Sequence, residues 1–383
     1  MRASIIISAL VAVLVGFGGS VAIILAAAKA VGATPDQTSS WVAALCLSMM
    51  VTTAVLSVYH RLPIVTAWST PGAALIATSS GVTMETAVGA FLLAGGLILI
   101  TAFFRPLNTL IERIPGSIAS AMLAGVLFSF VIAVFAHLQW TPALVLPLLT
   151  AFAILRPFSP AWAVLLVLAA GIALAFALGL TAPLEPLRLS SFVWVTPVFD
   201  PATLVGIGLP LYLVTMASQN LPGFAVLRAA GYTAPTRSIL TVTGLASLLT
   251  AGLAAHTSNL AAITASICTG PDAHPDKNKR WLCGPVYSLG YAVLALFGAS
   301  LVAMFASFPE ALIVTIAAIA LTGPFINALQ AGLDDANRRF AAVTTFLVTA
   351  SGISLFGIGA AFWGLVAGLT VLLLETLASK VKV

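Results

Sequence analysis

The sequence has 383 residues, of which 61% are hydrophobic and only 7% are charged, and its formal net charge is +5. Soluble domains carry roughly 25% charged residues, so a chain this poor in charge cannot cover its own surface in water. The composition excludes an ordinary soluble protein, and the small positive charge does not indicate a nucleic-acid partner. Cys46, Cys268 and Cys283 are scattered, which is typical of buried reduced thiols rather than of a disulfide or metal framework.

Long apolar runs predict an all-α integral membrane protein. Residues 5–28 carry no charge and exceed the ~20 residues that cross a ~30 Å hydrocarbon core as a helix. Because backbone groups in lipid must be paired internally, such runs should be helical. We predict fourteen transmembrane elements, seven in each half of the chain: 4–29, 40–59, 62–80, 85–104, 115–136, 142–155 and 160–180, then 203–227, 235–249, 250–270, 284–307, 309–331, 338–352 and 355–379.

Charge placement supports this count. If the N-terminus is cytoplasmic and the elements alternate, fourteen of the sixteen basic residues face the cytoplasm, and only Lys29 and Arg188 face outward. Lysine and arginine favour cytoplasmic loops, so we predict that both termini are cytoplasmic. The basic residues assigned to the cytoplasm are Arg2, Arg61, Arg105, Arg113, Arg156, Arg228, Arg237, Lys277, Lys279, Arg280, Arg338, Arg339, Lys380 and Lys382.

Seven elements per half is an odd number, so a duplicated second half would sit inverted in the membrane. A weak repeat supports duplication. A basic residue, a glycine three positions later and then a proline end both the first and the eighth element, at residues 29–35 and 228–235.

The third predicted element is interrupted. Two prolines argue against one straight helix, and residues 64–66 prefer extended structure. Ser69 or Thr70 followed by Pro71 is typical of an N-cap with proline at the first helical position. We predict an extended entry and then a half-helix over 71–81, about 16 Å long at ~1.5 Å per residue. The alternative is a continuous span that Pro71 merely kinks.

The tenth element has a matching pattern. Residues 251–256 lead into three capping-type residues, Thr257, Ser258 and Asn259, which predict a second half-helix over 257–270. In an inverted repeat the N-termini of the two half-helices would face each other near the midplane. Each would offer unpaired N–H groups and about half a positive charge, so together they would form an anion site without a basic side chain.

Several motifs together resemble those of the benzoate:proton symporter (BenE) family, within the fold superfamily of uracil/xanthine and sulfate permeases. They are GFGGS at 16–20, AWSTPGA at 67–73, SQNLPG at 218–223 and HTSN at 256–259, and residues 113–119 fit the start of the fifth span. The resemblance covers essentially the whole chain. It implies a 7+7 inverted repeat in which a core domain (1–104 and 201–307) works against a gate domain (105–200 and 308–383).

The resemblance also implies that benzoate or a related aromatic carboxylate binds where elements three and ten meet spans one and eight. Uracil/xanthine relatives place glutamates in spans eight and ten, whereas this sequence has Gln219, Asn220 and Asn259 there. The missing negative charge disfavours a nucleobase and suits an anion. The residues expected to contact the substrate are Phe17, Gly18, Ser20, Ser69, Thr70, Pro71, Gly72, Gln219, Asn220, Thr257, Ser258 and Asn259.

We expect N–H groups at 70–72 and 258–259 to bind the substrate carboxylate, and Phe17 to flank its ring. Structural alternatives stay open. The glycines of the first span could serve helix packing alone, Phe17 could face lipid or the core, and Gln219 and Asn220 could bond across helices.

His256 is the ionisable residue that the prediction places most clearly inside the membrane. Importing an anion against a negative interior costs about 2.3 kcal/mol per 100 mV, and one accompanying proton removes that cost. Histidine titrates near neutrality, so His256 is the candidate proton carrier. The alternative is a neutral histidine bonded to the backbone.

These features predict a secondary transporter of the bacterial inner membrane that imports an aromatic carboxylate, with a proton as the coupling ion. No nucleophile–base arrangement, metal cluster or cofactor motif is readable, so we do not expect an enzyme. The alternatives are a nucleobase permease, or an anion exchanger or channel of the sulfate-permease kind. Sulfate permeases usually carry a long soluble C-terminal domain, whereas this sequence ends soon after its last predicted span. The oligomeric state is open, with a homodimer as one candidate.

Overall fold

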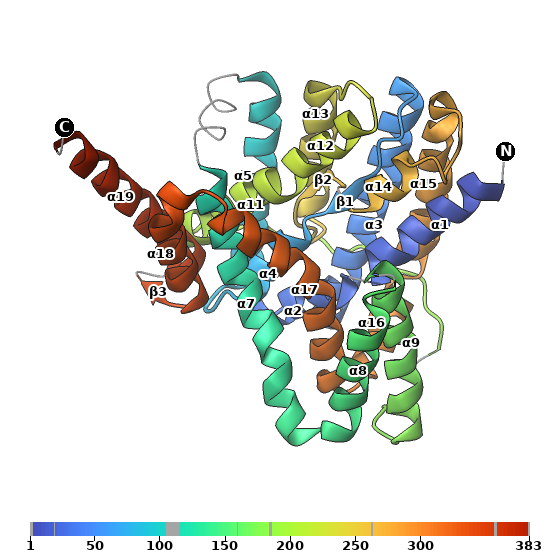
Figure 1. Cartoon of the computed structure of the whole chain (residues 1–383). Coiled ribbons are helices and arrows are strands. Elements are labelled where there is room, and N and C mark those ends of the chain that lie inside the picture. The colour runs from blue at the N-terminus through green and yellow to red at the C-terminus, as the bar shows by residue number, and fades with distance from the viewer. Residues whose placement is uncertain are drawn as a thin grey trace.

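The computed structural model describes residues 3–18, 20–104, 115–158, 160–183, 186–261, 263–355 and 358–381. Helices make up most of this part of the chain, and its two ends lie on opposite sides of the molecule (Figure 1). Five residues used in the sequence argument lie outside the described residues, namely Arg2, Gly19, Arg105, Arg113 and Lys382.

The elements run in chain order through two halves of similar length. The first half contains α1 (Ala3–Gly18), α2 (Val21–Ala30), α3 (Pro35–His60), β1 (Thr66–Trp68), α4 (Thr70–Ala77), α5 (Met84–Phe103), α7 (Gly116–Trp140), α8 (Pro142–Leu155) and α9 (Pro160–Ala177). The second half contains α10 (Pro201–Thr203), the π-helical turn η1 (Leu204–Gly208), α11 (Leu209–Thr215), the π-helical turn η2 (Met216–Asn220), α12 (Leu221–Ala229), α13 (Thr236–Ala251), β2 (Ser258–Leu260), α14 (Ile263–Thr269), η3 (Lys277–Leu282), α15 (Cys283–Leu296), α16 (Gly298–Ala306), α17 (Glu310–Leu333), η4 (Ala336–Arg338), α18 (Arg339–Ala350), β3 (Ser354–Leu355), β4 (Ile358–Gly359) and α19 (Ala360–Val381).

Several of these helices can cross a membrane. Within the described residues, seven are long and apolar enough, or eight if Lys277–Leu296 and Gly298–Ala306, bent by 62° against each other, count as one span. Two shorter apolar helices, Pro142–Leu155 and Ala163–Ala177, accompany them. The protein is therefore a mostly helical membrane protein, as its apolar runs predicted.

Three predicted elements differ in detail. The first span is interrupted between α1 and α2, where the Ser20 hydroxyl donates to the Gly16 carbonyl over 2.6 Å. The eleventh bends where α15 meets α16. The last was expected to begin at residue 355, but α19 begins at Ala360, because a short antiparallel hairpin of β3 and β4 precedes it.

The two interrupted elements meet at the centre of the molecule. β1 and β2 pair antiparallel, with Ala67 opposite Asn259, and they lie side by side in Figure 1. The expected extended entry and Ser69 N-cap of the third element are confirmed, although α4 ends at Ala77 rather than at residue 81. The half-helix expected from Thr257 is wrong, because this segment continues as a strand and α14 begins only at Ile263.

The physical reason for this correction lies in the partners of the backbone. The Ser258 N–H donates to the Ser247 hydroxyl of α13 over 2.9 Å. The Leu260 N–H donates to the Asn220 side-chain oxygen over 2.9 Å. Buried N–H groups need acceptors, and here neighbouring helices and β1 supply them, so the chain stays extended past the capping-type residues.

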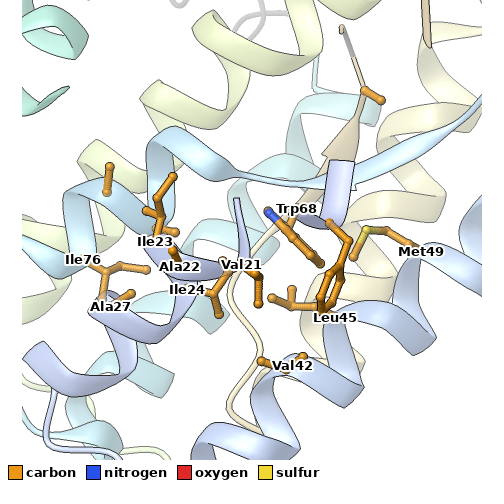
Figure 2. Close-up of a cluster of buried hydrophobic side chains, with 14 of the residues drawn as sticks. Val21, Ala22, Ile23, Ile24, Ala27, Val42, Leu45, Met49, Trp68 and Ile76 are labelled. Atoms are coloured by element: carbon orange, nitrogen blue, oxygen red, sulfur yellow. The ribbon is translucent and has the colours of Figure 1, made fainter. Parts of the chain in front are cut away.

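Buried apolar side chains hold the crossing in place. Figure 2 shows Trp68 of β1 between Val21 of α2 and the α3 residues Leu45 and Met49. All four side chains are buried. Within a lipid bilayer such packing stabilises the structure through van der Waals contacts rather than through the hydrophobic effect. The close packing of these side chains therefore holds the two strands in position.

Candidate functional site

Ser69 is the central polar residue of the crossing. Its hydroxyl accepts from the Gly72 N–H over 3.1 Å, which caps α4. It also accepts from the Thr215 hydroxyl of α11 over 2.9 Å, and Thr215 contacts the Thr257 hydroxyl at 3.0 Å. The Ser69 N–H donates to the Thr257 carbonyl over 3.1 Å. These bonds join both interrupted elements to the eighth span.

The first turn of α4 leaves one N–H group available. Pro71 has none, and the Gly72 N–H is taken by Ser69. No acceptor for the Thr70 N–H is found among the described residues. Because the first turn of a helix carries a partial positive charge, Thr70 is the α4 residue best able to bind an anion through its backbone.

Most polar groups of β2 that were expected to bind the substrate already have hydrogen-bond partners within the protein. Ser258 bonds through its N–H to Ser247 and through its hydroxyl to Ser48 of α3 at 2.6 Å. The Asn259 amide nitrogen donates to the Leu260 carbonyl over 2.9 Å. Its oxygen, Oδ1, is buried and has no hydrogen-bond partner among the described residues. Thus Ser258 holds the strand, whereas Asn259 keeps a free acceptor.

The adjacent residues Gln219 and Asn220 of the eighth span also differ in whether their side chains have hydrogen-bond partners. Asn220 is fully buried, and its side-chain oxygen accepts from the Leu260 N–H. This matches the alternative of bonding across helices. Gln219 is half-buried, and its amide has no hydrogen-bond partner within the described ranges. Both residues lie in the π-helical turn η2, which no local sequence pattern predicted.

His256 has both ring nitrogens engaged. Nδ1 accepts from the Trp41 indole N–H over 3.0 Å, and Nε2 lies 3.0 Å from the Ser69 carbonyl oxygen. An indole nitrogen can only donate and a carbonyl can only accept, so the imidazole is neutral with its proton on Nε2. These hydrogen bonds match the alternative to a proton carrier, which is a neutral histidine bonded to the backbone.

An aromatic cluster lies beside the crossing. The Phe17 and Trp68 rings meet edge to face at 5.8 Å, and Trp68 meets Tyr291 of α15 at 6.2 Å. The Trp68 indole N–H donates to the Ser20 hydroxyl over 2.9 Å. Phe17 is buried and faces the protein core rather than lipid. Tyr291 was not singled out from the sequence, because a tyrosine in an apolar span carries no distinguishing pattern.

The two glycines of the expected site have packing roles. A Cβ on Gly72 would lie 2.4 Å from Leu211 Cδ1, so α4 approaches α11 too closely for a side chain. A Cβ on Gly18 would lie 3.0 Å from Leu165 Cδ2 of α9. Close packing therefore accounts for Gly72 directly, and it brings Gly18 of α1 against α9.

The crossing is closed to solvent in this conformation. Ser69, Thr257, Ser258 and Asn259 are fully buried. A cavity of about 50 Å³ lies near the other end of α4, lined by Thr78, Ser79 and Ser129 among others. It has room for a few water molecules, so it is too small for an aromatic acid.

Metal chemistry has no visible basis at this site. No group of three or more histidine, cysteine, aspartate or glutamate side chains suited to a metal is found in the described part of the chain. The three cysteines are buried and free, as expected.

Comparison with known proteins places these features in context. Residues 1–374 match the family described as benzoate membrane transport protein. The inner membrane protein YdcO of Escherichia coli is 40% identical over 371 residues, which cover 95% of this chain and 93% of that protein. The benzoate membrane transport protein of Acinetobacter baylyi is 34% identical over 365 residues, with 95% and 93% covered.

Solved structures share the fold. The transmembrane domain of the cyanobacterial bicarbonate transporter BicA aligns with a TM-score of 0.61 over 96% of this chain and 97% of that one, at 12% identity. The murine solute carrier 26 family member A9 anion transporter, in its inward-facing state, aligns with a TM-score of 0.62 over 98% of this chain and 68% of that one, also at 12% identity. At such low identity these likenesses bear on the fold alone.

Proposed function

The chain belongs to the benzoate membrane transport (BenE) family, and from that premise we propose that it imports benzoate or a related aromatic carboxylate together with a proton. Proteins of this family are membrane transporters and not enzymes. The observation that carries the proposal is the crossing of β1 and β2, which brings the first turn of α4 and the Phe17 and Trp68 rings together in the protein interior.

The carboxylate would bind at the first turn of α4. The Thr70 N–H and the Gln219 amide, which have no hydrogen-bond partner in the described part of the chain, supply donors. Thr215 and Thr257 add hydroxyls once their mutual contact opens. A carboxylate accepts hydrogen bonds at both oxygens. Donors on two different elements can therefore each bind one of its oxygens.

The ring of the substrate would lie against Phe17 and Trp68. Aromatic pairs prefer edge-to-face contact, with centroids 4.5–7 Å apart. The existing Phe17–Trp68 pair has this geometry. The bond from Trp68 to Ser20 ties the ring to the break in the first span, so a movement of α1 against β1 would open or close this wall.

For the architecture we propose the 7+7 inverted repeat, with the core domain from 1–104 and 201–307 and the gate domain from 105–200 and 308–383. Close packing within the proposed gate supports this division. A Cβ on Gly125 of α7 would lie 2.6 Å from Thr349 Cβ of α18, and one on Gly364 of α19 would lie within 3 Å of the Thr345 carbonyl oxygen. Helices packed this tightly suit a body that moves as one unit during alternating access.

His256 remains the proposed proton carrier, under a condition that its hydrogen bonds impose. A second proton would have to sit on Nδ1, where it would face the Trp41 N–H. Two donors cannot share one hydrogen bond, so proton uptake requires His256 and Trp41 to separate. Loading the proton would then be linked to a conformational change at the crossing, which is the property a coupled carrier needs.

We propose the bacterial inner membrane as the location, with both termini cytoplasmic and a homodimer as the candidate assembly. The orientation rests on the distribution of basic residues. The name of the Escherichia coli relative supports the location.

The decisive experiment is uptake of labelled benzoate into liposomes containing the purified protein. We expect accumulation driven by an inwardly directed proton gradient and competition by other aromatic acids. A thermal-shift screen against benzoate, sulfate and uracil separates the alternatives. Stabilisation by uracil alone would support a nucleobase permease, and stabilisation by sulfate alone would support an anion exchanger or channel.

A further inference from the structure

Three helix ends meet at one rim of the molecule. α3 ends at His60, α5 ends at Phe103 and α13 begins at Thr236. The His60 Nε2 lies 2.8 Å from the Ser238 hydroxyl, and the Arg237 guanidinium lies 4.6 Å from the centre of the Phe103 ring. Because α3 and α5 are both long and apolar enough to cross a membrane, we place their ends at the boundary between hydrocarbon and water.

An open cleft of about 530 Å³ lies at this rim. Its lining includes Tyr59, His60, Thr236, Arg237, Ser238 and Thr241. The cleft is shallow and wide open to its surroundings rather than enclosed. The cleft lies on the surface, apart from the buried crossing of β1 and β2, so the transport site does not account for it.

The described lining of the cleft is positively charged. Arg237 is exposed, and no acidic partner for it is found in the described part of the chain. Among the described residues, the cleft lining includes neither aspartate nor glutamate. Arg61, the residue after His60, lies over the Trp281 ring at 5.4 Å. An arginine is well suited to a phosphate, which it can bind through two parallel hydrogen bonds.

Two apolar stripes lead from the cleft toward the middle of the membrane. On α3, Val55 and Val51 lie one and two turns before Tyr59 and are 49% and 45% exposed. On α13, Leu245 and Leu249 continue the face of Thr241 and Val242 at three- and four-residue spacing, and they are 44% and 75% exposed. Tyr59 itself is 80% exposed, which is typical of the aromatic residues at a membrane–water boundary.

We propose that this cleft binds the headgroup of an anionic phospholipid, with Arg237 on the phosphate and the two apolar stripes against the acyl chains. The stripes decide between a lipid and a free phosphate, since a soluble anion would gain nothing from them. Basic clefts between span ends are suited to anionic lipid headgroups. The lipid would bridge α3 and α13, which flank the β1–β2 crossing.

The test uses the purified full-length protein in neutral detergent and measures lipid binding by native mass spectrometry. The probes are phosphatidylglycerol, phosphatidylcholine and soluble glycerol phosphate. We expect phosphatidylglycerol to bind more tightly than phosphatidylcholine, and Arg237→Gln to weaken it about tenfold, the loss of one charge-assisted hydrogen bond. Arg228→Gln, which removes an exposed arginine outside the cleft, should leave the binding unchanged.

Each contrary result would overturn the proposal. Equal binding of the two lipids would remove the role of charge. Glycerol phosphate binding as tightly as the lipid would remove the role of the acyl chains. An equal loss in the Arg228 variant would mean that total charge, not this cleft, attracts the lipid. If Arg237→Gln fails to fold, Tyr59→Ala with Ser238→Ala replaces it, with the same weakening expected.

Discussion

The indole N–H of Trp41 donates to Nδ1 of His256 over 3.0 Å, across 215 positions of sequence. Both rings are fully buried, and Phe91 of α5 packs against each of them. The bond fixes the imidazole as neutral and directs its Nε2 proton to the Ser69 carbonyl. The candidate proton carrier His256 therefore connects Trp41 of α3 to the start of the half-helix α4.

The first prediction concerns proton coupling. If His256 carries the proton, His256→Gln should still bind benzoate but should no longer accumulate it against a gradient, because glutamine cannot take up a proton. The measurement is benzoate uptake with simultaneous recording of proton movement in liposomes. Trp41→Phe is the companion variant, since it removes the donor to Nδ1 without touching His256. Proton movement that stays unchanged in His256→Gln would assign the histidine a purely structural role.

The second prediction concerns the cap of α4. Ser69→Ala removes the acceptor for the Gly72 N–H, and loss of an N-cap costs about 0.5–2 kcal/mol. We expect lower thermal stability together with weaker benzoate binding. Thr83→Ala is a matched control, because Thr83 caps α5 at the surface. That variant should lose stability alone, and an equal loss of benzoate affinity in both would argue against a site at α4.

The third prediction separates two neighbours. Asn220→Ala leaves the buried Leu260 N–H without its acceptor, which costs about 1–3 kcal/mol, so it should lower the melting temperature. Gln219→Ala breaks no hydrogen bond found in the described residues, so its stability should hold while benzoate affinity falls. Thermal unfolding and benzoate titration of both variants make the comparison. Loss of affinity in neither variant would exclude η2 from the site.

The fourth prediction concerns recognition of the ring. Phe17→Leu removes the edge-to-face contact with Trp68 but keeps an apolar side chain. Aromatic pairs contribute about 0.5–1.5 kcal/mol beyond burial, so preference for benzoate over cyclohexanecarboxylate should fall roughly two- to tenfold. Phe128→Leu is the control, because Phe128 pairs with Phe346 away from the crossing. An unchanged preference in Phe17→Leu would show that the ring binds elsewhere.

Much of the architecture was predictable because lipid makes strong demands on sequence. Charge-free runs predicted the helices, and Ser69 before Thr70 and Pro71 predicted the start of α4 correctly. The chemistry of capping is local, so a few adjacent residues suffice to recognise it. Breaks that depend on contacts, such as the bend between α15 and α16, carried no such signal.

Local capping chemistry did not predict the structure of residues 257–259. Threonine, serine and asparagine are suitable N-caps, but they also fit a strand whose N–H groups find acceptors elsewhere. Here those acceptors are Ser247, Asn220 and β1, which lie on other elements. No local pattern distinguishes the two outcomes.

By itself, then, the sequence determined the membrane class, the positions of most helices and the family resemblance. These follow from hydrophobicity and local capping, which act over one helix or a few residues. Only the tertiary structure decided that Ser258 is held by α3 and α13 and that His256 is bonded to Trp41. It also decided that the Thr70 N–H and the Gln219 amide have no hydrogen-bond partner among the described residues. Whether a buried polar group is free or engaged depends on partners distant in sequence, and folding alone brings those partners together.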